Sequence, residues 1–435
     1  MTVSSNKLDQ RYLQSQALLA RANVAIPGQA QTFSKGWTQY PLGAAPVFAT
    51  RADGGYVWDA DGNRFIDWPM ALGPLLLGHN HEAVNDAIRK RLSDGVAFSL
   101  PTDEELSLAE RLIDWFPYAE RVRFGKNGSD ATSGAVRAAR AFTGRDVILC
   151  CGYHGWQDWF IGTTTRNAGV PNAVSELTIP FPYDDSGALE DLLRRHSGRV
   201  AAIIMEPMGI VEPSPGYLAE VRRLADEHEA VLIFDECWTG FRIDLQGAYG
   251  RFGVAPDLAC FGKALGNGAP ISVILGRADV MEMFEESFFS FTFGGDLIGI
   301  AAANAVLDVL EKEPVLAHVE RIGSGLLDGL RAAVNRHGLD EMVTLEGYPA
   351  RHVLNFSGDG HEGWLLKSVF QQEGCSAGVL AAGWHAPSYA HTEEDVEVTL
   401  AAYESALATM AEGLRNDNLA DALHGRMVEP VFRKP

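Results

Sequence analysis

The chain has 435 residues, of which 46% are hydrophobic and 21% are charged, and its formal net charge at pH 7 is −21. This length predicts two or three domain-sized units, and this composition excludes an intrinsically disordered chain and an integral membrane protein. The negative charge also argues against nucleic acid as a partner, whereas a small anionic ligand stays compatible with a locally positive site.

The N-terminal residues 1–21 mix polar and charged residues with scattered Leu and Ala, without the continuous apolar stretch of a secretory signal. We therefore expect a cytoplasmic protein, and no membrane span, because the longest apolar runs have only strand length. The cysteines are odd in number and lie mostly inside apolar runs, which predicts buried free thiols rather than disulfides or metal ligands. They are Cys150, Cys151, Cys237, Cys260 and Cys375.

Along the chain, a hairpin of two short strands around an Asp-Gly-Asn turn is predicted first, over Tyr56 to Asp67. From about residue 104 to 310, strand-like apolar runs alternate with amphipathic stretches, which favours a mainly parallel sheet covered on both faces by helices. The predicted strands are Arg121 to Phe124, Val147 to Cys151, Val200 to Met205, Val231 to Phe234 and Leu258 to Phe261, and the predicted helices are Ala131 to Phe142 and Leu218 to His228.

The last part of the chain predicts a smaller α+β unit, from the strand-like Leu354 to Phe356 and a helix over about Glu393 to Leu414. No linker rich in Pro, Gly or Ser separates this part from the rest. We expect residues 76–310 to form a large α/β domain, and residues 1–75 and 311–435 to contribute the two chain ends of a small domain.

The first segment that carries chemistry leaves a predicted strand at Phe124 and enters a helix through Asn127, Gly128 and Ser129. Free amides at a helix N-terminus favour an anion, especially phosphate, and Gly128 lets the backbone approach it closely. The alternative is an ordinary capped turn, with Ser129 or Asp130 as the cap.

The second segment is an apolar strand that ends in Asp235 and Glu236. In open parallel sheets the ligand crevice lies beyond the carboxyl ends of the strands. A carboxylate there can keep a cationic ring nitrogen protonated or bind a metal; the alternative is an aspartate that caps the following turn. The same argument applies to Glu206, which follows the preceding predicted strand.

The third segment places Lys263 between a predicted strand and the glycines at 266 and 268. A partly desolvated lysine can form a Schiff base, and the alternative is a strand-end lysine that only extends toward water. Together, a helix-terminus phosphate site, a strand-end carboxylate and a lysine about 28 residues later are the parts that hold pyridoxal phosphate.

With these segments, the sequence resembles the class III aminotransferases of fold type I, and most closely the branch that contains glutamate-1-semialdehyde aminomutase. The resemblance extends from about Pro27 to the end of the predicted Glu393 helix. Its further motifs are Tyr56 to Asp67, Ala141 to Asp146, Tyr153-His154-Gly155, Thr239-Gly240-Phe241-Arg242 after Asp235-Glu236, and Ala390 to Asp395.

This resemblance implies that Lys263 forms the Schiff base with pyridoxal 5′-phosphate and carries a proton between substrate and cofactor. It implies that Asp235 keeps the pyridine nitrogen protonated, and that Asn127, Gly128 and Ser129 bind the phosphate.

The resemblance also implies that Tyr153 stacks on the cofactor ring, and Glu206 matches an acid in the family's site. Thr292 matches a position whose hydroxyl reaches the phosphate of the neighbouring subunit. A homodimer with shared active sites is therefore implied.

The departures from the aminomutase concern its substrate pocket. Lys35, in Ser34-Lys35-Gly36, stands where the aminomutase has an arginine, and a lysine does not replace a bidentate guanidinium. Leu72 replaces a tryptophan, and residues 381–388 contain no counterpart of a late glutamate. Ser34 and Lys35 are thus expected to bind a different substrate, and this variant resembles aminotransferases of carbohydrate and secondary-metabolite pathways.

The sequence therefore predicts a pyridoxal-phosphate aminotransferase that moves an amino group from an amino acid, with glutamate as the expected donor, to a ketone or aldehyde acceptor. A keto sugar, keto cyclitol or dehydroshikimate-like cyclic ketone in a biosynthetic pathway is the expected acceptor class. The alternative is glutamate-1-semialdehyde 2,1-aminomutase. A non-enzymatic protein that binds the cofactor is disfavoured, because binding alone needs neither Lys263 nor Asp235.

Overall fold

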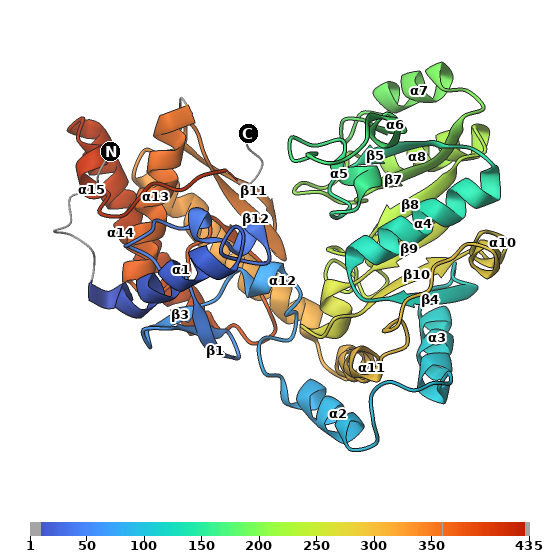
Figure 1. The fold of residues 1–435 in the computed structure, drawn as a ribbon. Coiled ribbons are helices and arrows are strands. Elements are labelled where there is room, and N and C mark those ends of the chain that lie inside the picture. The colour runs from blue at the N-terminus through green and yellow to red at the C-terminus, as the bar shows by residue number, and fades with distance from the viewer. Residues whose placement is uncertain (1–9, 359, 431–435) are drawn as a thin grey trace. The chain divides into compact units, whose positions relative to one another are not determined.

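The computed structural model describes residues 10–358 and 360–430, and these residues form two compact units (Figure 1). Within the described chain, unit 1 comprises residues 10–72, 77–81 and 317–430, and unit 2 comprises residues 73–76 and 82–316. In the described part of the chain, no helix is both long and apolar enough to cross a membrane.

Unit 2 is built on a seven-stranded sheet of order β4-β10-β9-β8-β7-β5-β6. The pairs β5·β6, β5·β7, β7·β8 and β8·β9 are parallel, whereas β10 runs antiparallel to both of its neighbours. The expected large and mainly parallel sheet is therefore confirmed. The strands are β4 (Arg121–Gly125), β5 (Val147–Cys151), β6 (Thr178–Pro180), β7 (Val200–Met205), β8 (Val231–Asp235), β9 (Leu258–Phe261) and β10 (Ser272–Gly276).

Helices cover both faces of this sheet, as parallel strands with fully apolar sequences require. Alternate residues along the strands enter two separate cores: Ile204 and Ile233 pack with α4, whereas Ile203 and Leu232 pack with α7 and α8. The helices of unit 2 are α2 (Glu82–Leu92), α3 (Asp103–Trp115), α4 (Gly128–Thr143), α5 (Asp158–Ile161), α6 (Asn172–Ser175), α7 (Ser186–Arg195), α8 (Tyr217–Glu227), α9 (Gly247–Phe252), α10 (Ala278–Met281) and α11 (Leu297–Lys312), with short 3₁₀ turns η5 (Lys263–Gly266) and η6 (Glu282–Glu285).

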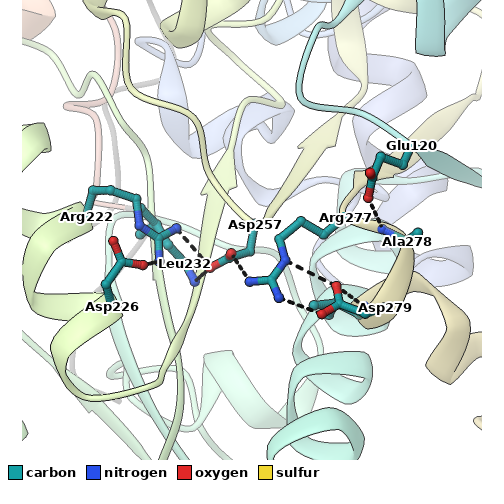
Figure 2. Close-up of polar contacts among 9 residues, drawn as sticks. Glu120, Arg222, Asp226, Leu232, Asp257, Arg277, Ala278 and Asp279 are labelled. Atoms are coloured by element: carbon teal, nitrogen blue, oxygen red, sulfur yellow. Dashed lines mark hydrogen bonds and ion pairs between the residues drawn. The ribbon is translucent and has the colours of Figure 1, made fainter.

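A buried carboxylate fastens the amino-terminal ends of β8 and β9 (Figure 2). Asp257, immediately before β9, accepts hydrogen bonds from the backbone of Leu232 at 2.7 Å, from Arg222 at 2.9 Å and from Arg277 at 2.6 Å. Asp257 is 4% exposed, so its charge depends on these donors rather than on water. The network joins α8, the central strands and the end of β10.

Unit 1 contains two three-stranded antiparallel sheets and a helical layer. Its core packs Trp68, Leu326, Phe370 and Tyr403 from separate segments. The strands are β1 (Ala49–Asp53), β2 (Tyr56–Asp59), β3 (Arg64–Ile66), β11 (Val343–Tyr348), β12 (Arg351–Phe356) and β13 (Trp384–His385). The helices are α1 (Leu13–Ala25), α12 (Val315–Arg336, which begins at the unit boundary), α13 (Gly360–Ser376), α14 (Glu393–Arg415) and α15 (Leu419–Ala422), with 3₁₀ turns η1 (Gln10–Tyr12), η2 (Phe33–Lys35), η3 (Trp37–Gln39) and η4 (Met70–Leu72).

The segment that closes the first part of unit 1 has an unusual backbone. Met70, Ala71 and Leu72 have φ values of 43°, 54° and 77°, and Gly73 continues the run at 91°. A left-handed conformation costs a residue with a Cβ roughly 1–2 kcal/mol. Burial of Met70 and a hydrogen bond from its N–H to Asp67 at 3.1 Å hold the turn in place.

The elements expected from periodicity are present, with small shifts at their ends. The predicted strand over Val231 to Phe234 extends to Asp235, and the predicted helix from Ala131 begins at Gly128. The apolar run of strand β10, which follows the turn residues Gly268 and Pro270, was not among the predicted strands. Four cysteines are buried free thiols as predicted, whereas Cys237 is half-buried. The expected domain boundaries stay a prediction.

Candidate active site

Five of the expected site segments lie at one edge of the unit 2 sheet. Strands β5, β7, β8 and β9 are parallel, and β4 runs in the same direction because β10 is antiparallel to both β4 and β9. The carboxyl ends of these strands therefore share one edge, where ligands of open α/β sheets bind. They lead into Asn127, Tyr153, Glu206, Asp235 and Lys263.

Asp235 is the most enclosed of these residues, with 4% of its surface exposed. Its Oδ2 lies 2.9 Å from Nδ1 of His154, and its Oδ1 accepts a hydrogen bond from the Cys237 N–H at 3.1 Å. An ionised carboxylate only accepts hydrogen bonds, so Nδ1 of His154 carries the proton. Two donors leave acceptor capacity on Asp235 for a third, such as a protonated ring nitrogen.

The sequence analysis names His154 only as part of the Tyr153-His154-Gly155 motif and predicts no function for its side chain. Its ring is buried between Trp159 and Phe160, and its backbone oxygen accepts a 2.7 Å hydrogen bond from the Thr132 hydroxyl. Within the described residues its Nε2 has no hydrogen-bond partner. His154 is thus fixed by α4 and by aromatic packing in the position that orients Asp235.

The start of α4 forms a narrow cradle for an anion. The first helical amides, those of Gly128 and Ser129, have no acceptor within the helix, because no earlier turn precedes them. A Cβ on Gly128 would lie 2.8 Å from the Cys237 sulfur, and one on Gly155 would lie 2.2 Å from the Ser129 hydroxyl. Only glycine fits at these two positions, so the backbone is accessible where a side chain would otherwise cover it.

Asp130 holds the turn that leads into the cradle. One carboxylate oxygen of Asp130 accepts hydrogen bonds from the backbone N–H of Asn127 at 2.7 Å and of Lys126 at 3.1 Å. The Ser129 hydroxyl accepts a 3.2 Å bond from the Trp156 N–H. The turn is therefore capped, but its N-cap residue is Asn127 and Asp130 is the third helical residue of the capping box, whereas the alternative interpretation named Ser129 or Asp130 as the cap. The cap leaves the amides of Gly128 and Ser129 for a ligand.

Tyr153 and Glu206 are held together by a backbone contact. The Tyr153 N–H donates to Oε1 of Glu206 at 2.9 Å, and Gly152 adopts φ +107° where a Cβ would lie 2.9 Å from the same glutamate. The Tyr153 ring is 52% exposed and packs edge-on against Phe160. Burial, and then the charge of Asp235, raise the pKa of the Tyr153 hydroxyl, which keeps it neutral.

Lys263 follows β9 in a left-handed conformation with φ +42°. Its Nζ lies 4.9 Å from the ring centroid of Trp238, a cation–π distance. The Trp238 side chain is nearly buried and contacts Gly73, where a Cβ would be 1.7 Å from the ring. Arg242 fixes that backbone by donating to the Gly73 oxygen at 2.9 Å.

Cys237 and Trp238 were not expected as site residues. Cys237 lies between the Gly128 cradle and Asp235, and burial, followed by the charge of Asp235, raises its pKa well above the usual value. Its thiol is therefore neutral. Both residues directly follow Asp235-Glu236, so their proximity in sequence was the signal that would have found them.

Three expected site residues are not part of this group. Thr292 lies in an exposed turn of unit 2 before α11. Ser34 and Lys35 belong to unit 1, where they form η2 and line a cavity of about 900 Å³.

The donor set at the sheet edge fits pyridoxal phosphate. The cradle at Gly128 and Ser129 suits a phosphate, Asp235 retains acceptor capacity for a ring nitrogen, and Lys263 supplies an amine. Nδ1 of His154, 2.9 Å from Oδ2 of Asp235, holds this carboxylate in place.

Comparison with known proteins decides the family. The family model for class-III aminotransferases matches residues 40–390, most of the chain. The chain belongs to the class-III aminotransferases. It is similar to the glutamate-1-semialdehyde 2,1-aminomutase of Halobacterium salinarum, with 37% identity over 413 residues that cover 83% of this chain and 93% of the relative. The aminomutase of Roseiflexus castenholzii is 39% identical over 337 residues, covering 73% and 77%.

Solved structures agree with this class-III aminotransferase fold. The FumI protein of Sphingopyxis sp. MTA144, solved with PLP, aligns with a TM-score of 0.86 and 30% identity over 92% of this chain and 97% of that one. The β-phenylalanine aminotransferase of Variovorax paradoxus aligns with a TM-score of 0.79 and 26% identity over 92% and 94%. This chain is thus a fold type I transaminase-family enzyme with pyridoxal phosphate as its cofactor.

Proposed function

We propose that this enzyme moves an amino group on pyridoxal phosphate held by Lys263, Asp235 and the start of α4. The observation that carries the proposal is the meeting of these three elements at one sheet edge. Tyr153 would lie over the cofactor ring, Glu206 would hold the Tyr153 backbone, and Asn127, Gly128 and Ser129 would receive the phosphate. When bound, the cofactor supplies a ring that accepts electrons from the substrate carbon.

The chain's own residues then hold and move protons. Once the substrate's amino group has replaced it on the cofactor, the freed Lys263 amine would take a proton from the substrate carbon and return it to the neighbouring reacting carbon. Asp235 would keep a proton on the ring nitrogen, and His154 holds the Asp235 carboxylate in place through the 2.9 Å contact of Nδ1 with Oδ2. The Trp238 face supports the amine of Lys263 while it is charged. Burial around Asp235 excludes water and so strengthens these interactions.

The leading substrate reaction is the 2,1-aminomutase reaction, the alternative of the sequence analysis. The similar curated relatives carry that name at 33–39% identity, which supports it better than transfer to an external acceptor. In this reaction the amino group of glutamate-1-semialdehyde moves from C2 to C1, which gives 5-aminolevulinate without a second substrate.

The second candidate is transfer from glutamate to a polar cyclic ketone. It is favoured by Lys35 and Leu72, which replace the arginine and tryptophan expected in an aminomutase pocket. This reaction needs an external donor, and the keto product leaves between two half-reactions.

One spectroscopic experiment separates the two reactions. The aminomutase should convert glutamate-1-semialdehyde to 5-aminolevulinate with no donor present, at a rate that added glutamate does not raise. The transferase should instead convert the cofactor's absorption spectrum with glutamate alone and release stoichiometric 2-oxoglutarate. A Lys263→Ala variant is the control for both, and activity in that variant would contradict the proposal itself.

We also propose a cytoplasmic homodimer in which Thr292 serves the cofactor of the partner subunit. The exposed position of Thr292 within its own chain supports this arrangement. Mixing Thr292→Ala and Lys263→Ala subunits should give heterodimers with one site that has the lysine but no hydroxyl and one with the reverse. Unchanged cofactor affinity at every Lys263 site in such mixtures would show that Thr292 acts in its own chain or only packs.

A further inference from the structure

Lys126 lies between strand β4 and the cradle at the start of α4, and the chemistry proposed for Lys263 does not involve its side chain. The Lys126 ammonium pairs with the Asp296 carboxylate, with Nζ 3.4 Å from Oδ2, and donates to the Asp296 backbone oxygen at 3.4 Å. Both side chains are mostly buried, with exposed fractions of 13% and 17%. Because little water screens these charges, they act on their surroundings more strongly than a surface pair does.

Asp296 is held independently of Lys126, because it is the N-cap residue of α11. Its Oδ1 accepts hydrogen bonds from the backbone N–H groups of Ile298 at 2.9 Å and Gly299 at 3.3 Å. An asparagine oxygen at an N-cap accepts the same bonds. Helix α11 can therefore begin at residue 296 without a negative charge there.

Two further carboxylates lie around the Lys126 ammonium. Asp130, in the first turn of α4, accepts a hydrogen bond from the Lys126 backbone N–H at 3.1 Å. Glu105, in the first turn of α3, lies so close to Gly295 that a Cβ there would be 2.7 Å from its carboxylate. Burial lowers the pKa of Lys126, and the charges of Asp296, Asp130 and Glu105 oppose that shift. These four groups together carry a net negative charge.

This negative charge is unfavourable for the cradle, because the cradle suits a phosphate. The free amides of Gly128 and Ser129 attract an anion, whereas the Asp130 carboxylate occupies the same helix end with the same sign of charge as a phosphate. Like charges repel more strongly where water is excluded. The Lys126 ammonium offsets this repulsion, and without it a phosphate would face uncompensated carboxylates.

We propose that Lys126 strengthens binding of the cofactor's phosphate by compensating the charges of Asp130 and Asp296, and not by contact with the phosphate. Lys126 is thus a positioning residue that acts through its neighbours and takes no part in proton transfer. The inference rests on the phosphate site proposed at the start of α4. Every residue that it involves belongs to unit 2.

Equilibrium binding of pyridoxal phosphate and of pyridoxal to the full-length chain freed of cofactor tests this inference, because the two ligands differ only in the phosphate. The ratio of their affinities isolates the phosphate contribution in each variant. We expect Lys126→Gln to lower this ratio about tenfold or more, the size expected when a partly buried charge near an anion is removed, and Lys126→Arg to retain it. Lys312→Gln, which removes an exposed lysine of α11, is the matched control and should leave the ratio unchanged.

Asp296→Asn separates charge compensation from a merely structural ion pair. If the ion pair only held α4 against α11, breaking it from either side would lower the ratio equally. Charge compensation instead predicts that Asp296→Asn does not lower the ratio. It also predicts that the double variant Lys126→Gln/Asp296→Asn recovers most of the wild-type ratio, because the two removed charges are opposite in sign.

Three results would overturn the inference: an unchanged ratio in Lys126→Gln, an equal loss in Asp296→Asn, or no recovery in the double variant. Equal affinity of the wild type for pyridoxal phosphate and pyridoxal would overturn the phosphate site itself, and the inference with it. If Lys126→Gln fails to fold, Asp296→Asn alone is decisive. Unchanged or tighter phosphate binding in that variant supports charge compensation, and weaker binding contradicts it.

Discussion

Asp235 ends strand β8 with its carboxylate enclosed and aligned by His154, and this is where the proposed chemistry depends most on one charge. Asp235→Asn keeps the shape but removes that charge, so the ring nitrogen would lose its proton. We expect the variant to retain the cofactor and proton abstraction to be slower by on the order of 100-fold or more. This is the size of effect seen when an active site loses one group that stabilises charge. Single-turnover rates at saturating cofactor measure this effect.

His154→Gln is the matched variant for this test, because it removes the ring that aligns Asp235 and leaves the carboxylate itself. It should slow the same step by less than Asp235→Asn does. If Asp235→Asn reacts at nearly the wild-type rate, Asp235 only caps the turn through the Cys237 N–H.

Part of this site was predictable from the sequence, because a carboxylate or a lysine directly after a predicted strand is placed at the edge of the sheet where ligands bind. Asp235 and Lys263 follow apolar runs, and their strands prove to be neighbours. Trp238 could have been found from its position just after Asp235-Glu236, but its contact with the Lys263 amine, and the role of His154, were not predictable in the same way. Their roles depend on which side chain each ring meets after the sheet has formed, and a single sequence does not encode that pairing locally.

At the scale of elements, the Asp257 network holds the amino-terminal ends of β8 and β9, opposite the edge that carries the site (Figure 2). Asp257→Ala leaves the buried Leu232 N–H without its acceptor and removes one of the two carboxylates that Arg222 contacts. We expect a loss of about 3–5 kcal/mol in the free energy of unfolding, the size typical of a broken buried ion pair. Chemical denaturation of the cofactor-loaded protein measures it.

Asp226→Ala is the control, because Asp226 also pairs with Arg222 but its side chain is 66% exposed. It should cost about 0–1 kcal/mol, as surface ion pairs do. An equal decrease in the free energy of unfolding in the two variants would mean that the buried Asp257 stabilises the fold no more than an exposed carboxylate does.

Elements were predictable where apolar periodicity and turn residues agree. Strands β5, β7 and β9 have the ends expected from their apolar runs. The left-handed turn at Met70 to Leu72 was not predictable from the sequence, because none of its three residues favours positive φ. Tertiary contacts impose that backbone, and the sequence pattern contains no trace of them.

At the scale of the whole molecule, buried titratable groups make stability depend on pH in opposite directions in the two units. Burial raises the pKa of Glu236 from 4.5 to about 7, although Thr239 and the Ala248 N–H oppose the shift. The contribution of Glu236 to the free energy of unfolding is therefore fully present below pH 4.5, and it is lost as the pH rises through 7. Burial lowers the pKa of His352 in unit 1 from 6.5 to about 4, so its contribution is present above pH 6.5 and is lost as pH falls through 4.

The variants Glu236→Gln and His352→Asn separate the two contributions. Between pH 4.5 and 7, the free energy of unfolding of Glu236→Gln should rise relative to wild type by about 3 kcal/mol, at 1.36 kcal/mol per pKa unit. His352→Asn should flatten the profile only on the acid side. Profiles parallel to that of the wild type would show that these groups titrate alike in the folded and unfolded chain.

The central claim is that Lys263 carries the cofactor, and borohydride reduction of the yellow enzyme followed by peptide mapping tests it most directly. The competing candidates are two lysines whose pKa values are lowered by burial: Lys126, which pairs with Asp296 at 3.4 Å, and Lys367 in the unit 1 cavity. The account predicts a label on Lys263 alone and none in Lys263→Ala. A label on Lys126 or Lys367, or a labelled Lys263→Ala protein, would contradict it.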